Sequence, residues 1–100
     1  MARVIKQRRS ARRALASARI LDQVVESQLP LVARLPEGRS RARAADFLAE
    51  LVLLSQAYRH HAEGWMSRRE LERRGHSTMR KLSRIRQRPP QSSTQFTEQD

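Results

Sequence analysis

The sequence predicts an all-α protein, in which a hairpin of two long helices precedes a short basic C-terminal helix or helix pair. Two observations support this fold class. Apolar residues recur every three or four positions over residues 3–29 and again over residues 44–62, and no stretch alternates in the manner of a strand. We expect a hairpin core over residues 1–64, a basic helical segment over 65–88 and a disordered tail over 89–100.

The first helix is predicted to span residues 3–29, where good helix formers dominate. Its apolar positions share one face, made of Val4, Ala11, Ala14, Leu15, Ala18, Leu21, Val25 and Leu29. The alanines on this face would let a partner helix approach closely. Pro30 is expected to end the helix, because the residue before a proline is pushed out of the α region. Residues 30–39 should then form a linker that lies on the core.

The second helix carries the strongest apolar pattern. Ser40 is expected to cap its start and Gly64 to end it in the left-handed region. Its broad apolar face is more than the first helix can cover, so the sequence predicts a homodimeric bundle. The predicted dimer or partner interface consists of Phe47, Leu48, Leu51, Val52, Leu54 and Tyr58.

The basic segment after Gly64 resembles a helix–turn–helix in its pattern. Ser67 and Glu70 have capping-box spacing, Gly75 is placed to break the chain, and Ser77 or Thr78 can cap a second helix. In a DNA-reading motif the early residues of that second helix contact base edges. Two simpler interpretations stay open: a basic amphipathic helix that packs on the bundle, and a mobile solvated tail.

The charge of the chain points to a polyanionic or acidic partner. Lys and Arg number 21 against 10 Asp and Glu, which gives a net charge of +11. Nearly all the cations are arginine, whose planar guanidinium binds phosphate in a bidentate manner. Codon bias in a GC-rich genome is the alternative origin of this arginine content.

These features favour a small, non-enzymatic nucleic-acid-binding protein, a regulator of transcription or an accessory factor that binds duplex DNA. The two basic ends of the chain would contact the phosphate backbone, and residues of the C-terminal segment would read any sequence. The predicted contact residues are Arg8, Arg9, Arg12, Arg13, Arg68, Arg69, Thr78, Arg80, Lys81 and Arg84.

The alternative function is that of a helical adaptor or inhibitor. It would capture an acidic protein partner through the apolar face of residues 44–62 and through its basic surface. Binding to a membrane surface through the N-terminal stretch is disfavoured, because the apolar face there is mostly alanine.

No motif in the chain indicates an enzyme, a metal site or a cofactor. The sequence has no cysteine, no glycine-rich phosphate loop and no nucleophile elbow. His60 and His61 are adjacent, which is the wrong spacing for two ligands of one metal on a helix, so we expect them to be capping or exposed residues. Trp65 is expected to pin the next segment to the core. The longest apolar run, Leu51–Leu54, is far too short to span a membrane. The expected location is therefore the cytoplasm.

Overall fold

The computed structural model describes the backbone of residues 2–87 and the side chains of residues 8–86. It contains three helices, α1 (Ala2–Arg34), α2 (Arg39–Ala62) and α3 (Arg68–Gln87). The predicted all-α class is confirmed for this part of the chain. The tail that the sequence predicts to be disordered, 89–100, lies outside the described residues.

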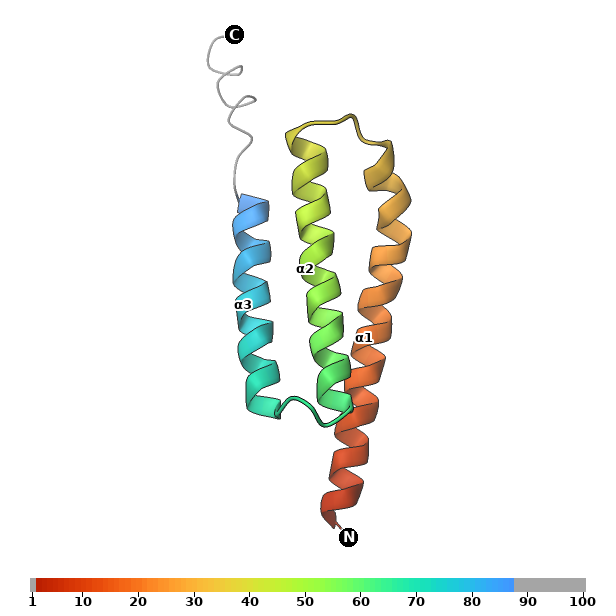
Figure 1. Cartoon of the computed structure of the whole chain (residues 1–100), viewed down its shortest axis with the longest axis vertical. Coiled ribbons are helices and arrows are strands. Elements are labelled where there is room, and N and C mark those ends of the chain that lie inside the picture. Colours follow the sequence, from red (N-terminus) through yellow and green to blue (C-terminus); the bar gives the residue numbers. More distant parts are fainter. Residues whose placement is uncertain (1, 88–100) are drawn as a thin grey trace.

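The three helices lie side by side with α2 in the middle, and successive helices run in opposite directions (Figure 1). Both α1 and α3 pack against α2, but they make no close backbone contact with each other. The N-terminal turns of α1 extend beyond the loop that joins α2 to α3 (Figure 1). A layer of this kind covers two flanks of α2 and leaves open the faces between them.

The hydrophobic core is small and centred on α2. It consists of four buried side chains, with three partly buried ones packed against them: Val25, Leu48, Leu51 and Leu82, then Leu21, Val32 and Phe47. Ala14 and Ala18 of α1 are also buried, as expected for the alanine face that the sequence turns toward a partner helix. Leu29, predicted on the same face, is exposed.

The predicted end of the first helix at Pro30 is wrong, because α1 continues through this proline to Arg34. A proline in a helix removes one i to i−4 hydrogen bond, and here the loss falls near the C-terminal end. Val32, beyond the proline, packs against the core, and its carbonyl accepts the N–H of Leu35 at 3.1 Å. Core packing thus outweighs the local cost of the proline.

The two loops use glycines with positive φ. Gly38, with φ of +148°, is the N-cap of α2, so the predicted cap Ser40 lies inside the first turn instead. Gly64, with φ of +86°, follows Glu63, the C-cap of α2, as predicted. Trp65 is 74% exposed and stacks at a tilt on the ring of His60, so it does not pin the next segment to the core.

The predicted helix–turn–helix is instead one continuous helix, Arg68–Gln87, which corrects the predicted break at Gly75. Among residues 2–87, only Gly38 and Gly64 have positive φ, so Gly75 is ordinary helical backbone. The predicted cap at the start of α3 is confirmed, because the N–H of Glu70 donates to Ser67 Oγ at 3.1 Å. The carboxylate of Glu70 turns instead to two arginines of α3, so the second half of the capping box is not formed.

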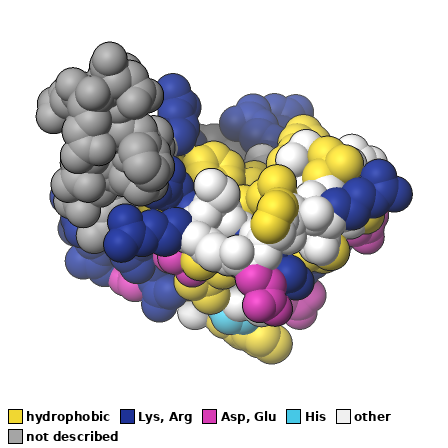
Figure 2. All heavy atoms as spheres, turned by 90° about the horizontal axis from the view of Figure 1, so that it is seen from above, with side chains coloured by type: hydrophobic (Ala, Val, Ile, Leu, Met, Phe, Trp, Pro, Cys, Tyr) yellow, Lys and Arg dark blue, Asp and Glu magenta, His cyan; other side chains and the backbone are white. Residues whose placement is uncertain are grey.

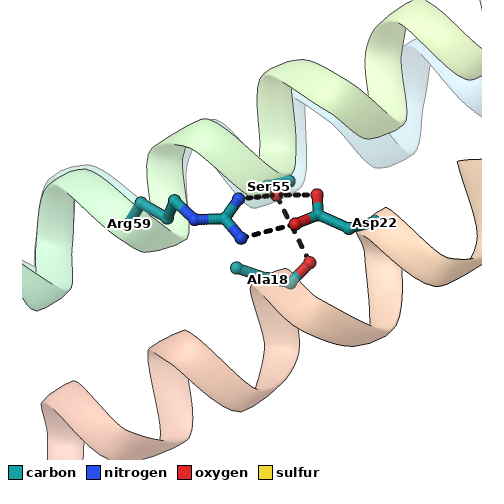
Figure 3. Close-up of polar contacts among 4 residues, drawn as sticks. All are labelled: Ala18, Asp22, Ser55 and Arg59. Atoms are coloured by element: carbon teal, nitrogen blue, oxygen red, sulfur yellow. Dashed lines mark hydrogen bonds and ion pairs between the residues drawn. The ribbon is translucent and has the colours of Figure 1, made fainter.

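A polar cluster centred on the buried Ser55 joins α1 to α2 (Figure 3). Ser55 of α2 is 1% exposed, and its hydroxyl donates to the Asp22 carboxylate at 2.6 Å, with the Ala18 carbonyl 3.3 Å away. Arg59 donates to Ser55 Oγ at 2.8 Å and pairs with the other oxygen of Asp22. These hydrogen bonds, from Arg59 first and Ser55 second, hold the pKa of Asp22 below its usual value of 3.8.

Candidate nucleic-acid interface and a neighbouring apolar trough

Four exposed arginines form a stripe along α3: Arg69, Arg73, Arg80 and Arg84. Their spacings of four, seven and four residues place them on one helical face. At 1.5 Å per residue the stripe is about 22 Å long. Leu71, Thr78 and Leu82 form a different face of the same helix, which is turned toward the bundle.

Among the four arginines of the stripe, only Arg73 pairs with an acidic side chain of the described residues. Glu70 pairs with Arg73 and Arg74, and the hydrogen bond from Arg73 is the main cause of its lowered pKa. Among the described residues, Arg80 and Arg84 have no ion-pair partner. Arg69 has none within that range either, so uncompensated charge lies at both ends of the α3 stripe.

Of the predicted contact residues, one is buried and another is exposed but pairs with α2. Thr78 is only 6% exposed, so it is not available to contact a base. The ammonium of Lys81 lies 4.0 Å from the carboxylate of Glu50 on α2. Of the residues predicted to read bases, the structure therefore leaves Arg80 and Arg84 on the solvent face of α3.

The N-terminal cations form a second basic surface at the opposite flank of α2. The exposed members are Arg8, Arg9, Arg12 and Arg13. Arg9 and Arg13 meet Arg68 of α3 around a pocket of about 430 Å³, which Tyr58 and His61 of α2 also line. The structure thus brings together part of the two basic ends that lie far apart in sequence.

His61 holds the walls of this pocket in place, a role that the sequence did not reveal. Its Nε2 lies 2.8 Å from Ser10 Oγ of α1, and its Nδ1 lies 2.9 Å from the carbonyl of Met66 in the loop before α3. The partner on α1 is 51 residues away in the chain, and no local sequence pattern reports such a contact.

The predicted dimer or partner interface is only partly accessible. Leu48 and Leu51 are buried within the single chain, which corrects their assignment to an intermolecular surface. Phe47, Leu54 and Tyr58 are half-buried, and Val52 is exposed. The homodimer itself stays a prediction.

A second pocket, of about 420 Å³, lies at the other end of α2. Side chains from all three helices line it, as in the first pocket: Val24, Gln28, Val32, Ser40, Arg43, Ala44, Phe47, Leu48, Ile85 and Arg86. Seen from above, this end of the molecule exposes hydrophobic side chains close to Lys and Arg side chains (Figure 2).

The two pockets open on the same side of the helical layer. On α2, Arg43 in one pocket and His61 in the other are 18 residues apart, which is about five full turns. The same separation joins Arg68 to Arg86 on α3. We call the surface between α1 and α3 that contains both pockets, with α2 beneath it, the apolar trough.

Comparison of the chain with protein-family models, with curated proteins and with solved structures found no match. Over the residues that the structure describes, no helix has both the length and the apolar character needed to cross a membrane.

Proposed function

We propose that this protein is a small nucleic-acid-binding protein that docks α3 against duplex DNA, without enzymatic activity. The α3 stripe is the observation that carries the proposal: four exposed arginines on one face of a helix whose other side is anchored to α2. An anchored helix presents its cations at fixed spacing, which lowers the cost of ordering them on binding.

The dimensions of the stripe suit a DNA duplex. The major groove is wide enough to admit one α-helix, and arginine binds either phosphates or the edge of guanine in a bidentate manner. The stripe length of about 22 Å corresponds to about six or seven base pairs at 3.4 Å each. Arg80 and Arg84, free of ion pairs among the described residues, would supply the strongest contacts.

The N-terminal arginines of α1, on the opposite flank of α2, would contact a separate stretch of nucleic acid in a way that does not depend on sequence. Arg8 and Arg12 are exposed and one turn apart, so both can face the same stretch of phosphates. The role that fits these surfaces is that of a regulator or accessory factor, in which a larger assembly supplies the chemistry.

A fluorescence-anisotropy titration tests the proposal. The full chain is titrated into a labelled random duplex at about 50 and 200 mM salt, a range over which binding dominated by phosphate contacts weakens steeply. We expect tight binding at the lower salt and a log–log slope of several ions. Weak binding even at the lower salt would contradict the proposal.

A further inference from the structure

The apolar trough leaves large hydrophobic side chains exposed that a fourth helix would cover. Three lie on the α1 rim, with exposed fractions of 61% for Ile20, 40% for Val24 and 51% for Leu31. Met79, on the α3 rim, is 62% exposed. Large apolar side chains gathered on one exposed face are typical of an interaction site.

Helical periodicity places these residues in line with the two pockets. On α1, Arg13 lines the first pocket, and Ile20, Val24 and Leu31 follow it after 7, 11 and 18 residues. All three separations are close to whole numbers of helical turns, so these side chains share one face. On α3, Met79 follows Arg68 by 11 residues and stands on the face that leads from one pocket to the other.

The charge around the trough selects among possible occupants. The side chains that line its two pockets include five arginines and no carboxylate: Arg9, Arg13 and Arg68 at one end, Arg43 and Arg86 at the other. A second copy of the chain docked face to face would bring these two sets of arginines together, at a cost in like-charge repulsion. An occupant with carboxylates at both ends of an apolar stripe would instead be attracted.

We infer that the trough binds an acidic amphipathic helix of a partner protein. The helix would lay its apolar stripe on Phe47, Leu54 and Tyr58, which are half-buried on the trough side of α2, in the manner of other helix-in-groove complexes. The distance from Arg68 to Arg86, about 27 Å at 1.5 Å per residue, corresponds to a bound helix of about five turns. Gly75 lies on the α3 rim between them, where a Cβ would meet nothing within 4 Å, so it leaves room for a neighbouring backbone.

This surface is separate from the α3 stripe. Arg80 and Arg84 line neither pocket, and their positions on α3 lie on a different face from Arg68 and Arg86. A nucleic-acid ligand and the acidic helix would therefore use different residues, and either interaction can fail without the other.

The test uses a fluorescent peptide of about five helical turns, with leucines at helical spacing on one face and glutamates on the rest. A second peptide carries lysine in place of every glutamate. Both are titrated by anisotropy with the full-length wild-type chain and with V24E/M79E, which places acids on both rims of the trough. The matched control is L29E/L53E, because Leu29 and Leu53 are 53% and 51% exposed and line neither pocket.

We expect the wild type to bind the acidic peptide and not the basic one. V24E/M79E should weaken this binding by about tenfold or more, L29E/L53E should change it little, and R80A/R84A should leave it near the wild-type value. Equal binding of both peptides, binding of neither, or an equal loss in the control would overturn the inference. Sedimentation velocity measures the oligomeric state of both chains. A wild-type dimer that V24E/M79E converts to a monomer would assign the trough to a second copy and overturn the inference.

Discussion

The hydroxyl of Ser55 on α2 donates a hydrogen bond to the carboxylate of Asp22 on α1, at 2.6 Å. Arg59 bridges the same two residues, so each member of the cluster has a partner in the folded chain (Figure 3). Because the hydrophobic core has few large side chains, this polar cluster contributes to fixing how α1 and α2 are aligned along their length.

Replacing Ser55 with alanine should lower the free energy of unfolding by about 1 kcal/mol. The change removes a buried hydrogen-bonding group, while Asp22 and Arg59 keep part of their exposure to water and each other as partners. Urea unfolding followed by circular dichroism measures the effect. S27A is the control, since Ser27 is exposed and bonds only to the Val24 carbonyl of its own helix. An equal loss of unfolding free energy in S55A and S27A would show that Ser55 has no special role.

Stability should fall in acid partly through Asp22. Its pKa is lowered in the folded state, so its stabilising effect is fully present above its usual value of 3.8 and is lost as the pH falls through the lower folded pKa. The melting temperature of D22N should therefore lie below that of the wild type at neutral pH and approach it in acid. Circular dichroism melts from about pH 2 to pH 7 measure both curves. Parallel curves over the whole range would exclude a role for this carboxylate.

Replacing Gly75 with alanine should stabilise the protein by up to about 1 kcal/mol. Gly75 is inside α3, and an added Cβ would meet nothing within 4 Å. The matched variant is G64A, which should be destabilising by about 1 kcal/mol or more, because the φ of Gly64 is +86°. Chemical denaturation compares the two. Destabilisation by G75A would indicate that the chain turns at this glycine, as in a helix–turn–helix.

Local patterns in the sequence predicted the helices and much of their apolar faces, because residues three or four positions apart lie on the same face of a folded helix. Ala14, Ala18 and Val25 are buried as their spacing indicates. The errors at Pro30 and Gly75 have one physical cause: residues beyond each breaker pack against the bundle, and this packing outweighs the local preference.

The candidate sites were less predictable than the helices. The basic character of α3 was evident, but the burial of Thr78 depends on which face α2 covers. The pocket shared by Arg13 and Arg68 depends on tertiary packing between residues more than 50 positions apart. Such long-range placement leaves no periodic signal in the chain.

The salt dependence of DNA binding by R80A/R84A tests the central claim most directly. Removing one arginine–phosphate interaction should reduce the slope of log affinity against log salt by about 0.9, so this double variant should reduce it by nearly two. R34A/R39A removes the same charge from two exposed arginines that flank the loop between α1 and α2. This control variant should retain nearly the full slope. Equal slopes in the two variants would show that α3 has no special part in binding and would contradict the proposed function.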